Sequence, residues 1–287
     1  MTRADAVLLV AHGSRSAQAM KEMSALSASV AELCRPAEVR IGYLELCDPA
    51  ATEVAEKLLA GGATEIVVAP LMLHAAGHTK SDVPAVVVEA RARHPHARIH
   101  YARPLGTDHA LLSLARRHVR EARGLGLPLA LFSRGSSDPD ANAEAYKVGR
   151  LLADMTGAPL VASGFSGITW PSVAETLDQL RRLGAHRIAA LAWFIATGVL
   201  IERMRQEFDA FSADTGVEVV DCGYLGTGPE LAALLAERVE EALSGRAAAN
   251  CDACAYRRPF PGLEDRVGMA IGTGHSHLAA EHRSHHS

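Results

Sequence analysis

Short runs of apolar residues alternate along the chain with longer segments in which apolar residues recur at every third or fourth position. The short runs are typical of strands buried on both faces, and the longer segments have the spacing of amphipathic helices. In the first half this pattern predicts strands at about 6–10, 39–44, 66–69 and 98–101, and helices at about 17–33, 50–60, 85–93 and 107–123. Such alternation indicates an α/β fold with a parallel sheet that helices cover on both faces.

The same pattern begins again after a stretch with glycine and proline at residues 124–128, and a strand is expected at residues 129–132. One interval of 122 positions separates Gly13 from Gly135, Pro49 from Pro171, and Gly62 from Gly184. A single register of this kind favours an internal duplication. We therefore predict two similar domains, residues 1–124 and 125–245, followed by an irregular tail over residues 246–287.

Composition narrows the class of protein. With 48% hydrophobic and 22% charged residues the chain resembles a soluble globular protein, and a net charge of −4 implies no general attraction to nucleic acid or anionic membranes. The apolar part of the N-terminus is too short for a signal peptide, and the longest apolar run, residues 188–201, falls short of the ~18 residues of a membrane span. The glycine motifs of nucleotide-binding loops do not occur. We expect a cytoplasmic protein.

Three side chains with metal-binding or acid–base chemistry follow predicted strands of the first half. His12 follows the first strand, Glu45 the second and His78 the third. Because the carboxyl ends of parallel strands meet at one edge of a sheet, we expect these side chains to lie together. Two imidazoles and a carboxylate suit a divalent transition metal, and a neutral imidazole can also accept a proton. The alternative is that each is an ordinary loop residue.

The second half differs from the first at these three positions. The interval of 122 residues places Arg134, Gly167 and Leu200 opposite the candidate ligands. The repeat therefore keeps the fold and loses the reactive groups. We assign the metal chemistry to the first half and expect the second half to serve as a wall or scaffold, with Arg134 as a candidate for binding a carboxylate.

Further polar residues are predicted at the same edge of the sheet. Gly13 and Ser14 lie at the start of the helix predicted at about 17–33, where backbone N–H groups suit a carboxylate or phosphate. The side chains suited to an acidic ligand are Ser14, Arg15, Lys80 and Arg103. The alternative for each is a helix cap or a solvated charge. His74 is an auxiliary candidate for a metal ligand, and Ser81 and Asp82 are expected to cap the following helix.

Five cysteines are scattered over the chain, and an odd number does not resemble a disulfide framework. Cys34, Cys47 and Cys222 are expected to be small buried hydrophobes. Only Cys251 and Cys254 have the spacing of zinc or iron–sulfur ligands. A complete cluster would need a second chain, Cys222 or a histidine of the tail.

The tail ends in a histidine-rich tract. Its members are His275, His277, His282, His285 and His286. Five imidazoles would bind Co²⁺, Ni²⁺ or Zn²⁺ loosely, which suits storage or delivery better than catalysis. The alternative is an incidental histidine-rich end.

Three ordered motifs resemble those of one enzyme family. They are a strand followed by H-G-S-R at residues 9–15, Y-L-E-L-x-x-P at residues 43–49, and P-L-x-L-x-x-x-G-H-x-x-x-D-V-P at residues 70–84. Together they resemble the class II tetrapyrrole chelatases, specifically the sirohydrochlorin cobaltochelatase family of cobalamin biosynthesis. The second half resembles the repeat of the long, two-domain members. The Cys-x-x-Cys tail resembles tails of long members, some of which carry an iron–sulfur cluster.

The resemblance implies that the chain inserts Co²⁺ into sirohydrochlorin without ATP, so that its partners are this macrocycle and the divalent ion. His12 and His78 match the family's metal-binding and proton-accepting pair, and Glu45 matches a nearby acidic position. Sirohydrochlorin has many carboxylates, which the basic side chains at this edge of the sheet are expected to bind. The nearest alternative is the same reaction with Fe²⁺, for siroheme, or with Ni²⁺.

Two interpretations come from other classes of protein. A metallochaperone would use the histidine-rich tail as its working part, and a periplasmic binding protein would have two α/β lobes. The lack of an export signal disfavours the second of these. A homo-oligomer is compatible with the sequence.

Overall fold

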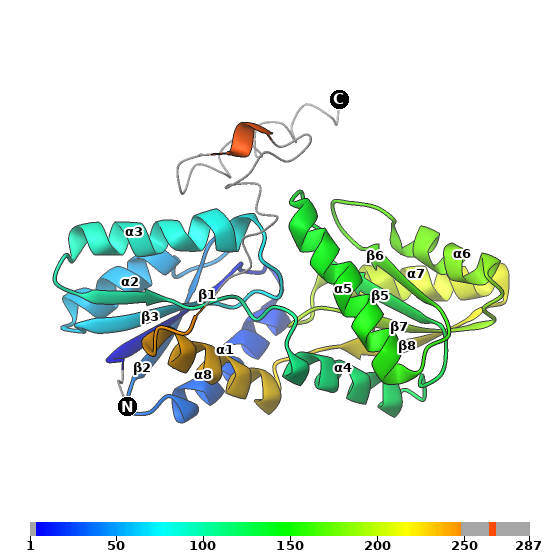
Figure 1. Ribbon diagram of the computed structural model, residues 1–287, viewed down its shortest axis with the longest axis horizontal. Coiled ribbons are helices and arrows are strands. Elements are labelled where there is room, and N and C mark those ends of the chain that lie inside the picture. The colour runs from blue at the N-terminus through cyan, green and yellow to red at the C-terminus, as the bar shows by residue number, and fades with distance from the viewer. Residues whose placement is uncertain (1–3, 248–263, 268–287) are drawn as a thin grey trace. The chain divides into compact units, whose positions relative to one another are not determined.

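In the part of the chain that the structure describes, eight parallel strands form two separate sheets (Figure 1). The computed structural model describes residues 4–247 and 264–267. The strands are β1 (Ala6–Ala11), β2 (Glu38–Tyr43), β3 (Glu65–Pro70), β4 (Arg98–Tyr101), β5 (Leu129–Ser133), β6 (Val161–Phe165), β7 (Arg187–Ala192) and β8 (Glu218–Tyr224). The order is β2-β1-β3-β4 in the first sheet and β6-β5-β7-β8 in the second.

A helix follows each strand, as parallel neighbours require a crossover connection. The α-helices are α1 (Ala17–Leu33), α2 (Ala51–Ala60), α3 (Val83–Arg93), α4 (His109–Glu121), α5 (Pro139–Thr156), α6 (Val173–Arg182), α7 (Val199–Thr215) and α8 (Pro229–Leu243). A π-helical turn, η1 (His78–Asp82), precedes α3, and a short 3₁₀ helix, η2 (Glu264–Arg266), lies beyond α8. Among the described helices none is long and apolar enough to cross a membrane.

The predicted fold class, two similar parallel sheets flanked by helices, is confirmed. The two halves repeat even in small details. An isolated bridge joins Tyr43 to Ala50 in the first half, and another joins Phe165 to Ser172 in the second. Both members of the second bridge lie 122 positions after those of the first, which is the interval found in the sequence.

The compact units do not follow the sequence repeat. Among the described residues, one unit contains those up to Gly13, Ser27–Gly106 and those from Leu235 onward; the other contains Ser14–Leu26 and Thr107–Leu234. Helices α1 and α8 therefore begin in the second unit and end in the first.

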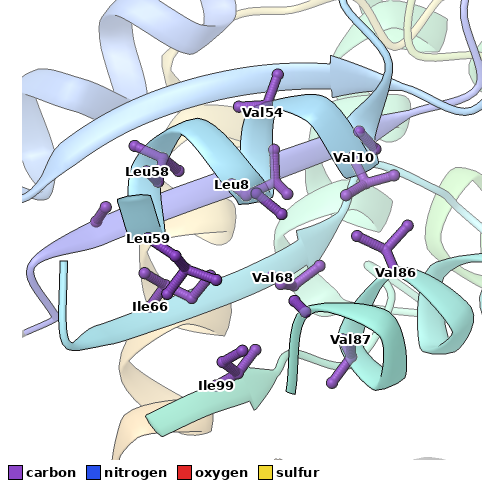
Figure 2. Packing of buried hydrophobic residues seen from close by; sticks show 14 of the residues in the cluster. Leu8, Val10, Val54, Leu58, Leu59, Ile66, Val68, Val86, Val87 and Ile99 are labelled. Atoms are coloured by element: carbon purple, nitrogen blue, oxygen red, sulfur yellow. The ribbon is translucent and has the colours of Figure 1, made fainter. Parts of the chain in front are cut away.

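The core of the first unit lies between its sheet and two helices (Figure 2). Every residue of β1 and β3 is buried, because alternate side chains point to opposite faces and both faces are covered. Leu8 and Val10 of β1 and Ile66 and Val68 of β3 face α2 and α3. The helices contribute Val54, Leu58, Leu59, Val86 and Val87 to this cluster. A rigid sheet of this kind fixes where its strands end.

The second unit is built in the same way. Helices α6 and α7 pack against one face of its sheet, where Leu177 and Met204 meet Phe132 and Ile188. Helices α4 and α5 contact the strands β5 to β8. The sequence predictions for Cys251, Cys254 and the histidine-rich tract fall outside the described residues.

Candidate metal centre

The central strand of the first sheet delivers His12 to the carboxyl edge. Strand β1 lies between β2 and β3, and it ends at Ala11, directly before His12. Glu45 lies two residues after the end of β2, and His78 begins the π-helical turn η1 after β3. The strand order β2-β1-β3 therefore brings three separate loops to one edge, as predicted from the sequence.

Backbone hydrogen bonds continue past the ends of β1 and β2 and fix the two loops to each other. The N–H of Leu44 donates to the carbonyl of Ala11, and the N–H of Glu45 donates to the carbonyl of His12, each at 3.0 Å. Gly13 has a φ of +103°, and a Cβ atom there would lie 1.9 Å from the carbonyl oxygen of Glu45. Only glycine allows this close approach of the two loops.

The three side chains form one compact group. A ring nitrogen or carboxylate oxygen from each of His12, Glu45 and His78 lies within 4.8 Å of those of the other two. Nε2 of His12 is 2.7 Å from Oε1 of Glu45. The rings of His12 and His78 meet edge to face, with centroids 4.7 Å apart. In the part of the chain that the structure describes, this is the group with the donor set of a metal site.

The three side chains of the group are only partly buried. The His78 side chain is 16% exposed, the His12 side chain 27% and the Glu45 side chain 47%. Two imidazoles and one carboxylate bind Zn²⁺, Co²⁺, Fe²⁺ or Ni²⁺, and three protein ligands leave coordination positions open to another molecule. The predicted metal ligands are therefore brought together.

Asp82 lies beside this group and was not predicted to take part in it. Its Oδ2 is 2.7 Å from Nδ1 of His78. We expected Asp82 to cap the helix α3, but its side chain makes no capping hydrogen bond and its backbone is already helical. The prediction of a cap is therefore wrong. The spacing of four residues between His78 and Asp82 was the available signal, because residues four apart on a helix face each other.

The turn that carries His78 is attached to the sheet by a half-buried tyrosine. The hydroxyl of Tyr101, at the end of β4, donates to the carbonyl of Thr79 at 2.6 Å. Burial raises the pKa of Tyr101, so this hydroxyl keeps its proton throughout the physiological range. Thr79 also donates from its hydroxyl to the carbonyl of Ala76 at 3.0 Å. The position of His78 is thus set by β4 as well as β3.

The other predicted site residues lie on loops or helix starts after strands. His74 and Lys80 are half-buried, in the segment after β3, and His74 is outside the group of three. Ser14 accepts a hydrogen bond from the N–H of Ser16, at the start of α1, and Arg15 is exposed. Their roles toward an acidic ligand stay predictions.

Arg103 is already engaged by a carboxylate of its own unit. Its Nε and Nη2 donate to the two carboxylate oxygens of Glu241 at 2.8 and 2.9 Å. Buried Arg238 donates to the same Glu241 at 3.1 Å and to the carbonyl of Leu105 at 3.2 Å. Glu241 thus lies between two guanidinium groups, and this arrangement fixes the loop after β4 on α8.

The equivalent edge of the second sheet has different chemistry. Arg134 is exposed directly after β5, and Leu200 is the second residue of the regular helix α7, where the first half has a π-helical turn.

Cys222, which we considered as a cluster ligand, is buried as expected. Burial raises the pKa of its thiol to about 12, which disfavours the thiolate that a metal ligand needs.

Known proteins with similar sequences and structures are chelatases. A sirohydrochlorin cobaltochelatase from Priestia megaterium is 34% identical over 88% of this chain and 84% of its own length. A sirohydrochlorin ferrochelatase from Bacillus subtilis strain 168 is 29% identical over 82% of this chain and 91% of its own length. The chelatase SirB from Bacillus subtilis subspecies spizizenii, solved in complex with cobalt, superposes with a TM-score of 0.72 at 26% identity, over 84% of this chain and 95% of that chain.

The family profile of CbiX matches the chain twice, at residues 6–122 and 128–242. Each match covers one sheet with its helices, so the internal duplication found in the sequence is a duplication of this family's fold. The chain therefore belongs to the CbiX family of class II chelatases, in its long, two-domain form.

Proposed function

We propose that this protein inserts Co²⁺ into sirohydrochlorin without ATP. The observation that carries the proposal is the group of His12, Glu45 and His78, whose donor atoms lie within 4.8 Å of one another at the edge of the first sheet. The similarity to sirohydrochlorin chelatases over most of the chain supports the choice of macrocycle.

The reaction exchanges protons for a metal ion. A divalent ion enters the macrocycle as two pyrrole N–H groups lose their protons, so the balanced products are the metallated ring and two protons. The site must therefore bind a partly hydrated ion for a short time and must also accept protons. Imidazoles serve both needs, because a neutral ring is a metal ligand and a base near neutral pH.

The contact between His12 and Glu45 has a consequence for the binding of the metal ion. A ring nitrogen and a carboxylate oxygen 2.7 Å apart share one proton when no cation lies between them, as a charge-assisted hydrogen bond. An arriving divalent ion takes the place of that proton, so binding of the ion releases it. Once the ion has passed to the macrocycle, the same pair can accept a pyrrole proton.

His78 is prepared as the second base. Its Nδ1 faces Asp82 at 2.7 Å, which in the neutral ring leaves the lone pair on Nε2. The two imidazoles together can therefore remove the two pyrrole protons. The basic residues Arg15, Lys80 and Arg134 are proposed to bind carboxylates of the macrocycle, as bidentate or point-charge partners.

Iron is the second candidate for the metal. One relative is a sirohydrochlorin ferrochelatase, and a solved SirB structure from Bacillus subtilis holds Fe³⁺ at a TM-score of 0.75 and 26% identity, over 85% of this chain and 99% of that chain. Imidazole and carboxylate ligands accept either ion, and supply in the cell governs which one is bound.

The test is an anaerobic absorbance assay of metal insertion into sirohydrochlorin, with Co²⁺, Fe²⁺ and Ni²⁺ compared at equal concentration. We expect the full chain to raise the rate of Co²⁺ insertion well above that of the protein-free mixture, without ATP. A faster reaction with Fe²⁺ would reassign the metal. No acceleration with any of the three ions would overturn the proposed activity.

A further inference from the structure

We propose that Asp82 is a positioning residue that holds His78 in one tautomer, with the ring proton on Nδ1 and the lone pair on Nε2. The effect on catalysis rests on the proposed chelatase function, whereas the tautomer does not. The carboxylate oxygen and Nδ1 are 2.7 Å apart, and each of the two side chains is only 16% exposed. A carboxylate at this distance accepts the Nδ1 proton in preference to water.

The contact lies within the π-helical turn. The N–H of Val83 donates to the carbonyl of His78, five residues earlier, which is the hydrogen bond that defines a π-helix. Asp82 is the last residue of this turn, and its side chain lies beside the ring of His78 and makes no capping hydrogen bond to α3. In the second unit the corresponding Leu200 lies in a regular α-helix, so among the described residues the π-helical turn occurs where the histidine is.

Hydrogen bonds fix the backbone of the turn η1, so the carboxylate of Asp82 can hold the imidazole of His78 in one orientation. Tyr101 donates to the carbonyl of Thr79 from the sheet, and the side chain of Thr79 is bonded to Ala76 within the segment. Thr79 itself is only 5% exposed. The backbone on the N-terminal side of the turn is therefore fixed, and Asp82 completes the arrangement from its C-terminal side.

The two imidazoles of the group consequently differ. Nε2 of His12 points to Glu45 at 2.7 Å, and its Nδ1 is 3.3 Å from the carbonyl of Gly13. A short contact of His12 is therefore with Glu45, a member of the metal group, and a short contact of His78 is with Asp82, outside that group. A carboxylate on the second nitrogen also makes a metal-binding imidazole a stronger donor.

The first test is the tautomer itself, measured by ¹⁵N NMR of the full-length protein at about pH 8.5, where an ordinary imidazole is neutral. The His78 signals are assigned by their loss in His78→Ala, because the chain has 14 histidines. We expect the wild-type ring to carry its proton on Nδ1. Asp82→Ala should return the ring to a mixture of tautomers, and Asp82→Asn, which keeps the shape, should weaken the preference. A wild-type His78 with its proton on Nε2 would overturn the proposal.

The second test is the affinity for Co²⁺, measured by the absorption of the bound ion without sirohydrochlorin. Loss of the hydrogen-bonding partner of a metal-binding imidazole typically lowers metal affinity by about 10–100-fold, and we expect a loss of this size in Asp82→Ala. The matched control is Glu89→Ala, which removes an α3 carboxylate that pairs with Arg93. Equal affinities in wild type and folded Asp82→Ala would refute the role, and Asp82→Asn provides the same comparison if circular dichroism shows that the alanine variant does not fold.

Insertion kinetics connect the two results to function. Because Asp82 acts through His78, its substitution should lower kcat and leave the KM for sirohydrochlorin unchanged. A raised KM with unchanged kcat would contradict a positioning role. The NMR and Co²⁺ measurements use no macrocycle, so failure of the proposed activity and failure of this inference give different results.

Discussion

Gly13→Ala isolates the close contact between the two loops that hold His12 and Glu45. An alanine there has two separate costs. The first is the backbone conformation, since a φ of +103° is strained for any residue with a Cβ and costs about 1–3 kcal/mol of stability. The second is a collision, because the new Cβ would lie 1.9 Å from the carbonyl oxygen of Glu45.

The collision has a predictable size. Unbonded carbon and oxygen atoms in proteins stay more than about 3 Å apart, so the loop of Glu45 must move by about 1 Å or more. This movement breaks the hydrogen bond from the Glu45 N–H to the His12 carbonyl and separates the two ligands. A displacement of about 1 Å at a reacting centre costs on the order of 10²-fold in rate. We therefore expect a loss of this order in Co²⁺ insertion.

Gly62→Ala is the matched control, because Gly62 has a φ of +104° and no atom within 4 Å of the Cβ position. Both variants should lose about 1–3 kcal/mol in urea unfolding, with a larger loss for Gly13→Ala. Only Gly13→Ala should lose Co²⁺ affinity and insertion rate in the anaerobic assay. Equal insertion by the two folded variants would show that the close approach of the loops does not set the geometry of the site.

Three further predictions concern stability and substrate. Glu65→Gln should lower the free energy of unfolding by about 1–3 kcal/mol at pH 7. Hydrogen bonds from Arg98 and His100 hold the pKa of Glu65 below its usual range. The difference in unfolding free energy between wild type and Glu65→Gln should therefore disappear as pH falls below about 4. Equal stabilities of the two proteins at pH 7 would contradict this prediction. Arg134→Ala should raise the KM for sirohydrochlorin more than it lowers kcat; an unchanged KM would place Arg134 outside the substrate site. Removal of residues 275–287 should lower activity only at limiting Co²⁺, and equal activities across a cobalt titration would indicate an incidental tail.

The pattern of apolar residues predicted the architecture well because the central strands β1, β3 and β5 are buried on both faces. The uninterrupted run at residues 66–69 lies within β3, and the periodic segment at residues 17–33 is the helix α1. The interval of 122 positions recurs in the structure, down to the isolated bridges. The compact units could not be predicted in this way, since the pattern does not show that their boundaries fall inside α1 and α8.

The three metal-binding candidates were predictable because strand ends of a parallel sheet meet at one edge. Asp82 was missed for a physical reason. Aspartate before a helix is usually a cap, and that interpretation took precedence over the spacing of four residues, which also allows the carboxylate to face His78. The pairing of Arg103 with Glu241 was equally hidden, since the two residues are 138 positions apart. Contacts between distant segments depend on packing that local patterns do not record.

The central claim is that His12 and His78 load the metal and accept the protons of the macrocycle. Anaerobic Co²⁺ insertion into sirohydrochlorin by His12→Ala and His78→Ala tests it most directly, with His186→Ala, an exposed residue of the second unit, as the control. Loss of one general base typically costs ~10²–10⁴-fold, so each of the two variants should be slower by at least about tenfold while the control keeps its rate. Near-normal turnover by both folded variants would contradict the account.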